Sequence, residues 1–246
     1  MAIDHSITYK NNFFKNYPHR QRLRKIFYYL DKIKNKTTYA DIGCSNAYLT
    51  NRIAKKYNID LVTGYDFCQE NLAIARNNYA NLEFFYFDLN HKFFQQQSVD
   101  DESKTIQNNY QQYSLVTCFE TLEHVGNVEI ALQNILKMVE KGGYALITVP
   151  IEVGFWGVLK FVIKVLFYNY NMAELNYTKG KLRSLHLHYL ASLIFNKNIT
   201  KYRMAENGYG THFGFDFREI DKLLLKLGRK YNRYKHLTTV FYLIAG

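Results

Sequence analysis

The sequence predicts an α/β protein that is built on a doubly wound, mostly parallel sheet. Short apolar segments alternate with segments of helical periodicity from residue 38 to residue 150, the pattern of parallel strands joined by crossover helices. Segment 113–119 is apolar along its whole length, as expected for a central strand that is covered on both faces. Segment 38–50 combines a buried strand, a turn at Gly43 and the start of a helix, which together form a nucleotide pocket.

The individual elements follow from the same periodicities. The predicted core strands are 39–42, 60–65, 82–87, 113–119 and 144–149, and the predicted core helices are 47–57, 69–79 and 127–139. A helix over 217–227 and a hairpin of 230–236 and 239–245 complete the chain. Gly142 and Gly143 are expected to stop helix 127–139. In helix 69–79 the residues expected to face inward are Leu72, Ala73, Ile74 and Ala75.

Before the core, segment 19–34 has the spacing of an amphipathic helix with basic residues on its outer face. Its predicted buried positions are Leu23, Ile26, Phe27, Leu30 and Ile33. Such a helix packs on the sheet, and it can also border a ligand pocket.

The 246 residues fit a single domain with four parts. These parts are an N-terminal helical region (1–36), a ligand-binding core (38–150), an insertion after strand five (151–215), and a C-terminal helix with a hairpin (216–246). Residues 95–112 are polar and low in complexity, and we interpret them as a loop.

The insertion contains two unusual segments. Residues 154–168 are apolar on nearly all sides, apart from Lys160 and Lys164, and are too few to span a membrane. They suit a helix in a membrane interface, a lid over a hydrophobic acceptor, or a buried or dimer contact, and the sequence leaves these open. In LHLHY (185–189) two histidines stand at i and i+2, which share a face only on a strand, and we assign them no metal.

Net charge and cysteine content limit the kinds of binding partner and the cellular compartment that we expect. The formal net charge is +11, and residues 1–36 carry nine Lys or Arg against two acids. This suits an anionic partner (phospholipid, nucleic acid or a pyrophosphate-linked substrate) and equally a solvated basic surface. Cys44, Cys68 and Cys118 lack metal-ligand spacing, and residues 1–10 lack the apolar stretch of a signal peptide. We therefore expect reduced cysteines and a cytoplasmic location, with peripheral membrane contact through 154–168 as an option.

Segment 41–50, DIGCSNAYLT, resembles motif I (D-x-G-C-G-x-G) of the class I S-adenosylmethionine (SAM)-dependent methyltransferases. Asp41, Gly43 and Cys44 match the motif, whereas Ser45 and Ala47 replace its second and third glycines. The resemblance implies a Rossmann-like, seven-stranded sheet that is mostly parallel with an antiparallel C-terminal strand, and it implies SAM as the cofactor. A SAM-binding protein without catalytic activity is the alternative that the two lost glycines favour.

The same resemblance assigns cofactor contacts to the ends of the strands. Asp66 would hold the ribose hydroxyls, Asp88 would contact the adenine amino group, and the first turn would lie beside the methionine part of SAM. The expected cofactor-binding residues are Asp41, Gly43, Cys44, Ser45, Ala47, Asp66, Phe67, Asp88, Leu89, Phe119 and Glu120.

Segment 119–125, FETLEHV, resembles the motif E-x-L-E-H-V of ubiquinone-type O-methyltransferases. This resemblance implies O-methylation of a small or lipid/saccharide-linked acceptor, with Glu120 and His124 as catalytic residues beside the transferred methyl group. An imidazole can accept the proton of an acceptor hydroxyl near pH 7, so His124 is the candidate base. The alternative is that His124 only hydrogen-bonds the backbone and shapes the loop.

Glu120, Glu123 and His124 also resemble the metal half-site E-x-x-E-H of small-RNA 3′-end 2′-O-methyltransferases. A later histidine completes that ligand set, and His212, just before GFDFREI, would take its place here. The implied alternative function is a metal-assisted RNA 2′-O-methyltransferase. Our preferred assignment contains no metal, because the segment TVPIEVGF departs from that family and the stretch after it is apolar. The sequence predicts no oligomeric state.

Overall fold

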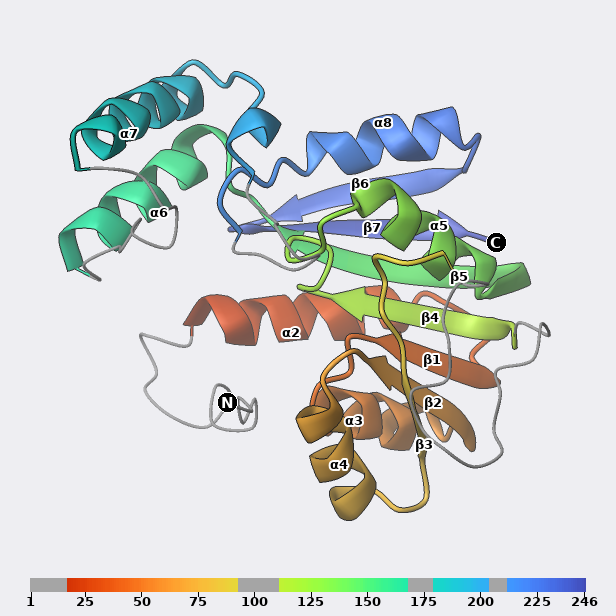
Figure 1. The fold of residues 1–246 in the computed structure, drawn as a ribbon. Coiled ribbons are helices and arrows are strands. Elements are labelled where there is room, and N and C mark those ends of the chain that lie inside the picture. The colour runs from red at the N-terminus through yellow and green to blue at the C-terminus, as the bar shows by residue number, and fades with distance from the viewer. Residues whose placement is uncertain (1–16, 93–110, 168–178, 204–211) are drawn as a thin grey trace.

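The computed structural model describes residues 17–92, 111–167, 179–203 and 212–246 (Figure 1). The predicted polar loop 95–112 lies almost entirely outside these ranges, so it stays a prediction. All three cysteines lie within them and are free thiols, as expected.

Seven strands form one sheet in the order β3-β2-β1-β4-β5-β7-β6. The pairs from β3 to β5 are parallel, and β7 runs antiparallel to both β5 and β6. This confirms the predicted seven-stranded, mostly parallel sheet with an antiparallel C-terminal strand. The strands are β1 (Thr38–Ile42), β2 (Leu61–Asp66), β3 (Glu83–Tyr86), β4 (Tyr113–Phe119), β5 (Val139–Pro150), β6 (Tyr231–His236) and β7 (Thr239–Ala245).

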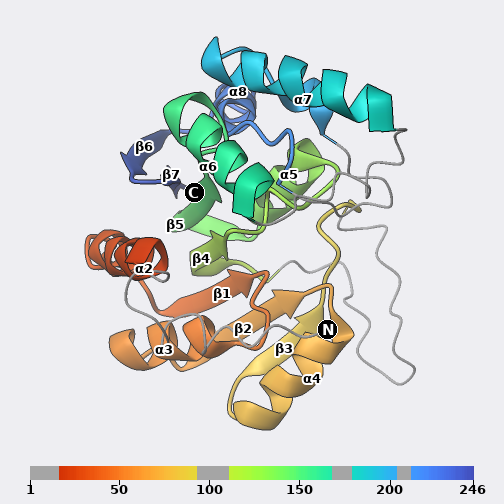
Figure 2. The ribbon, with the colours of Figure 1, turned by 90° about the vertical axis from the view of Figure 1, so that its left-hand side faces the viewer.

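Helices cover both faces of the sheet (Figures 1 and 2). On one face α2 (Tyr17–Leu30), α3 (Tyr48–Tyr57) and α4 (Gln69–Asn78) share one apolar core. On the other face α5 (Val128–Lys137) and α8 (Arg218–Lys226) belong to a second core. Tyr39 and Ala40, neighbours on β1, belong to different cores, as expected for side chains that alternate across a sheet. The order of the strands reverses between β1 and β4, and ligands bind at such a switch point.

The insertion forms α6 (Gly154–Phe167), α7 (Lys179–Ile194) and a short 3-10 helix (Thr200–Tyr202). Figure 2 looks onto the carboxyl ends of the parallel strands and shows α6 and α7 above them, with α2 and α3 on the opposite side. The rings of Phe161 and Tyr189 join the insertion to the second core.

The face of α6 that points away from the core exposes apolar side chains, namely Phe155, Leu159, Val162 and Ile163. Lys160 does not extend from this face, because its Nζ donates to Glu152 Oε1 at 3.0 Å. The side chain of Lys164 lies outside the described residues. Membrane contact through 154–168 stays a prediction. Among the described helices, none has both the length and the apolar character that crossing a bilayer requires.

Several boundaries and faces differ from the predictions. β5 begins at Val139 rather than Tyr144, because Val139 already pairs with Tyr113 across the β4–β5 ladder. Helix α5 therefore ends at Lys137, and Gly142 and Gly143 lie inside the strand instead of stopping the helix.

In α4 only Leu72 and Ala75 are buried, whereas Ala73 and Ile74 are exposed, since one helix face cannot contain four consecutive residues. Segment 185–189 is helical, so its two histidines do not share a face; the side chain of His186 lies outside the described residues. Helix α2 ends at Leu30, four residues before the predicted end, and buries Tyr29 in place of Phe27.

The turn after β1 has an unusual backbone. Gly43 has φ of +75°, and Ser45 and Ala47 also adopt positive φ values of 50° and 59°. The turn therefore keeps a glycine-like conformation at the two positions where the motif glycines are replaced, although non-glycine residues are strained there. A Cβ added to Gly43 would lie 2.3 Å from Thr121 Oγ1, so the turn and the loop after β4 touch at this glycine.

Replacing Gly43 by alanine should destabilise the protein more than replacing Gly142. Both positions have positive φ, which costs alanine about 1–2 kcal/mol, but a Cβ at Gly142 would meet nothing within 4 Å. We expect Gly43→Ala to lower the free energy of unfolding, measured by urea denaturation, by at least about 1 kcal/mol more than Gly142→Ala. Equal losses in the two variants would mean that the contact with Thr121 relaxes without cost.

Candidate functional site

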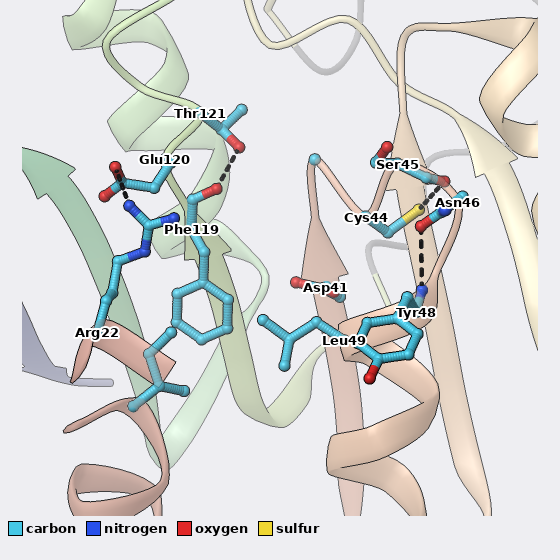
Figure 3. A pocket seen from close by; sticks show the side chains of 12 residues that line it. Arg22, Asp41, Cys44, Ser45, Asn46, Tyr48, Leu49, Phe119, Glu120 and Thr121 are labelled. Atoms are coloured by element: carbon cyan, nitrogen blue, oxygen red, sulfur yellow. Dashed lines mark hydrogen bonds and ion pairs between the residues drawn. The ribbon is translucent and has the colours of Figure 1, made fainter. Parts of the chain in front are cut away.

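A pocket opens at the carboxyl ends of β1 and β4 (Figure 3). One wall comes from α2, the opposite wall from the Gly43 turn and the start of α3, and the end of β4 closes the pocket between them. The lining residues are Arg22, Ile26, Asp41, Gly43, Cys44, Ser45, Asn46, Tyr48, Leu49, Phe119, Glu120 and Thr121. Six of the residues predicted to bind the cofactor are therefore together: Asp41, Gly43, Cys44, Ser45, Phe119 and Glu120.

The carboxylate of Asp41, on β1, connects this strand to α3 and to β4. Its Oδ2 accepts a hydrogen bond from the Thr50 hydroxyl of α3 at 2.5 Å, and its Oδ1 accepts one from the Thr117 hydroxyl of β4 at 2.6 Å. The residue is only 4% exposed. Burial raises the pKa of Asp41 to about 6, although both hydrogen bonds favour the charged form.

Asp66 stabilises the turn from the end of β2. Its two carboxylate oxygens accept the backbone N–H groups of Ser45 at 2.8 Å and Cys68 at 2.9 Å. Phe67, the next residue, is 45% exposed, whereas Ala47 is fully buried at the start of α3. Contact of Asp66 with the ribose, and of Phe67 and Ala47 with the cofactor, stays a prediction.

Asp88 and Leu89 follow β3 and do not line the pocket described above. Asp88 Oδ1 accepts the backbone N–H of Asn90 at 2.8 Å, and Asn90 Oδ1 in turn accepts the N–H of Gly126 at 2.8 Å. Asp88 thus shapes a turn that connects the end of β3 to the loop after β4. The side chain of Leu89 is buried, and the adenine contact of Asp88 stays a prediction.

Arg22 is a pocket residue that the sequence reasoning did not single out. Its Nη1 donates to Glu120 Oε2 at 2.6 Å (Figure 3), and its Nη2 lies 2.9 Å from His19 Nδ1. The only sequence signal was the basic amphipathic helix itself, which contains several similar arginines. The structure thus places α2 beside the candidate cofactor pocket, whereas its role at an acceptor pocket stays a prediction.

A second group of side chains lies at the loop after β4. One ligand atom from each of Glu123, His124 and His212 lies within 4.8 Å of the others. The rings of the two histidines are 4.3 Å apart between centroids, and His212 Nδ1 is 3.8 Å from Glu123 Oε1. Glu120 is turned away from this cluster toward Arg22, so three of the four residues of the metal alternative come together.

The carboxylate of Glu123 is fully buried, and neither of its oxygens has a hydrogen-bond partner among the described residues. Burial and the nearby charge of Glu120 raise the pKa of Glu123 well above its usual value. A buried carboxylate with two imidazoles as neighbours is a donor set that suits a divalent cation, which would supply the missing positive charge. The residues present therefore fit a metal ion.

Arg203 positions this loop from the insertion. Its guanidinium donates to the backbone carbonyls of Leu122 at 3.3 Å and Glu123 at 3.4 Å, and also to that of Val125. A Cβ on Gly214 would lie 2.4 Å from the backbone nitrogen of Arg203, so a glycine is required where the segment after His212 passes. These contacts fix the end of the insertion against the loop that carries Glu123 and His124. Asp216 precedes α8, and its Oδ1 accepts the N–H of Arg218, the first residue of the helix, at 3.0 Å.

The raised pKa of Asp41 predicts a specific pH dependence of stability. Because the pKa is about 6 in the folded state and 3.8 ordinarily, the folded state holds the proton between about pH 4 and 6 while the unfolded chain releases it. This contribution to the free energy of unfolding should fall by about 3 kcal/mol as the pH rises through that window, and stay constant above it. We expect Asp41→Asn to lack this decrease in urea denaturation at a series of pH values, whereas Asp60→Asn, at an exposed aspartate, should follow the wild type. Parallel profiles for Asp41→Asn and the wild type would contradict the assignment.

Known proteins with similar sequences or structures support the same fold. The chain is 32% identical over 112 residues to the ubiquinone biosynthesis O-methyltransferase of Hydrogenovibrio crunogenus. The aligned region covers 46% of this chain and 42% of that protein. The chain thus spans about two fifths of this curated relative. Magnesium protoporphyrin IX methyltransferase from Synechocystis PCC 6803, solved with bound SAH, has a TM-score of 0.56 at 12% identity over 96% of this chain and 89% of its own. The methyltransferase domain of bacterial CtHen1 has a TM-score of 0.53 at 14% identity, over 93% and 99%. At these identities the structural likeness shows the fold alone.

A family model described as a methyltransferase domain matches residues 14–193. The match covers more than half of the chain and includes α2, the Gly43 turn and the loop after β4. The pocket between these segments is the place where the motif resemblance puts SAM. The chain therefore belongs to this methyltransferase domain family and is a SAM-dependent methyltransferase.

Proposed function

We propose that this methyltransferase transfers the methyl group to a hydroxyl oxygen, and that a divalent cation held by Glu123, His124 and His212 positions the acceptor. The observation that carries the proposal is the buried Glu123 carboxylate, which has two imidazoles beside it and no hydrogen-bond partner among the described residues. Two of its residues, Glu123 and His124, lie in the loop after β4, which begins with Glu120 of the SAM pocket. Acceptor and cofactor would therefore meet at the carboxyl end of the central strand.

The residues of this chain have separate tasks in such a reaction. The Gly43 turn and Arg22 hold the cofactor, and alignment of the acceptor oxygen with the sulfonium methyl supplies much of the rate. A bound cation would orient the acceptor hydroxyl and lower its pKa. His124 cannot bind a cation and accept a proton with the same nitrogen, so the general-base role applies to it only if no cation is bound there.

Two acceptor classes have support. The named activity of the Hydrogenovibrio crunogenus relative supports O-methylation of a small molecule, which includes the lipid- or saccharide-linked acceptors that the motif E-x-L-E-H-V implies. The gathering of Glu123, His124 and His212 supports the second candidate, a metal-assisted RNA 2′-O-methyltransferase, because a ribose at an RNA 3′ end offers two neighbouring hydroxyls to one cation. Membership of a methyltransferase family supports either enzyme over a non-catalytic SAM-binding protein.

Arg22 should contribute to SAM affinity. Its guanidinium lines the pocket beside Glu120, where it can bind the carboxylate of the cofactor with a charge-assisted hydrogen bond. We expect Arg22→Ala to weaken SAM binding about tenfold in a calorimetric titration. Arg229→Ala, between α8 and β6 at the amino end of the strands, is the matched control and should bind as the wild type does. Unchanged affinity in Arg22→Ala would limit this arginine to its ion pair with Glu120.

The cation can be tested without the acceptor. Metal-free protein should bind Mn²⁺ in a calorimetric titration, and Glu123→Gln and His212→Ala should each weaken this binding by about tenfold or more, because each variant removes a ligand. Glu129→Gln, which changes a partly exposed carboxylate paired with Lys226, is the matched control and should leave the affinity unchanged.

Methyl transfer to the acceptor should stop with a chelator and return with added Mn²⁺. Equal Mn²⁺ affinity in Glu123→Gln and the wild type, together with transfer that the chelator does not affect, would reject the cation and leave His124 as the candidate base.

A further inference from the structure

The outer faces of α2 and α3 form a concave surface that the methyl-transfer reaction does not explain. Its lining contains four basic side chains (Arg20, Arg24, Arg52 and Lys56) and two aromatic ones (Phe27 and Tyr28). We call this surface the basic groove. Figure 2 shows that the two helices that form it lie side by side on the same side of the sheet.

The charge of the basic groove is poorly balanced. Among the described residues that line it, Asp31 is the only acid, which gives this lining a formal excess of three positive charges from four cations and one anion. Asp31 is also already bound, since its Oδ1 accepts Lys56 Nζ at 2.9 Å and the Tyr57 hydroxyl at 2.7 Å. Such an excess attracts an extended anion, and the attraction weakens as salt is added.

The aromatic residues alternate with the cations. Arg52 and Lys56 lie over the ring of Phe27, at 5.3 Å and 4.7 Å from its centroid. Tyr28 is 47% exposed, and Lys25 and Lys32 lie over its ring at 4.9 Å and 4.4 Å. An exposed tyrosine and a half-buried phenylalanine among cations match single-stranded nucleic acid, whose bases stack on aromatic side chains while its phosphates bind Lys and Arg.

The basic groove lies next to the SAM pocket because both use the same two helices. On α2, Arg22 points into the pocket, whereas Arg20 and Arg24 line the groove. On α3, Tyr48 lines the pocket and Arg52 lines the groove one turn later. From Arg20 to Asp31 the helix rise gives the groove a length of about 16 Å.

We propose that the basic groove docks a single-stranded RNA whose end reaches the SAM pocket. This inference rests on the proposed function in its second form, because it identifies the surface that would hold the RNA acceptor. A concave surface with a half-buried ring between two cations fits a polynucleotide strand better than the plane of a lipid headgroup layer.

The test measures binding of a fluorescently labelled, mixed-sequence single-stranded RNA to the full chain by anisotropy. The double variant Arg24→Glu/Arg52→Glu changes one cation on each helix of the groove and no residue of the SAM pocket. We expect its RNA affinity to fall about tenfold or more, and the slope of log K against log salt to decrease by about 0.7 for each lost phosphate contact. Tyr28→Ala should weaken binding about fivefold, through lost stacking.

The matched control is Lys55→Glu/Lys141→Glu, which makes the same change in net charge at exposed lysines outside the groove. It should retain RNA binding within about twofold once the general effect of net charge is screened by salt. Equal RNA affinities in the two double variants would overturn the proposal. The proposal would also be overturned if Arg24→Glu/Arg52→Glu no longer floated with phosphatidylserine vesicles but kept its RNA affinity, because the groove would then be a lipid-binding surface.

Failure of the docking surface can be distinguished from failure of the proposed reaction. Groove-dependent RNA binding without methyl transfer to RNA would keep the docking surface and reject RNA methylation. Metal-dependent methyl transfer to a small acceptor, with no groove-dependent RNA binding, would keep the reaction and reject the groove.

Discussion

The structure of the cofactor site depends on one buried carboxylate. The Asp41 carboxylate accepts hydrogen bonds from two threonine hydroxyls, those of Thr50 on α3 and Thr117 on β4. It thereby connects the strand that leads into the turn to this helix and to this strand. The backbone beyond it can then adopt the positive φ values of Gly43, Ser45 and Ala47, because the surrounding contacts hold it there. Ser45 and Ala47 replace two motif glycines in this turn, so the fixed conformation of the turn includes local backbone strain.

The loop after β4 contains a second buried carboxylate, that of Glu123, whose neighbouring groups differ from those of Asp41. Asp41 has hydroxyl donors, whereas Glu123 has the imidazoles of His124 and His212 as neighbours and no hydrogen bond among the described residues. A buried charge without donors is costly unless a cation or a proton compensates it. The loop is nevertheless held firmly, since Arg203 binds three of its carbonyl oxygens. The rigid support of the loop and the lack of a hydrogen bond to Glu123 among the described residues are the observations behind the proposed cation site.

Helix α2 connects the cofactor site to the surface. Its apolar residues Ile26 and Leu30 are buried in the core, which fixes the rotation of the helix. With that rotation fixed, Arg22 must face Glu120 and the basic residues on either side of it must face α3 and solvent. A single amphipathic pattern therefore sets both the charge inside the pocket and the charge of the basic groove outside it.

Much of this protein is determined by short-range sequence patterns. The periodicities predicted the strands, the core helices and the C-terminal hairpin. The motif resemblance predicted the antiparallel strand and six of the pocket residues, namely Asp41, Gly43, Cys44, Ser45, Phe119 and Glu120. The boundary of β5 was not predictable in this way, because it depends on pairing between Val139 and Tyr113 on another strand. The partner of Glu120 was not predictable either: Arg22 lies 98 residues earlier in the chain, on a helix with several equivalent arginines. Only the packing of α2 and of the segment that begins at His212 decided which side chains meet. Side-chain partners that are far apart in the sequence are selected by the shape of the assembled core and not by a local pattern.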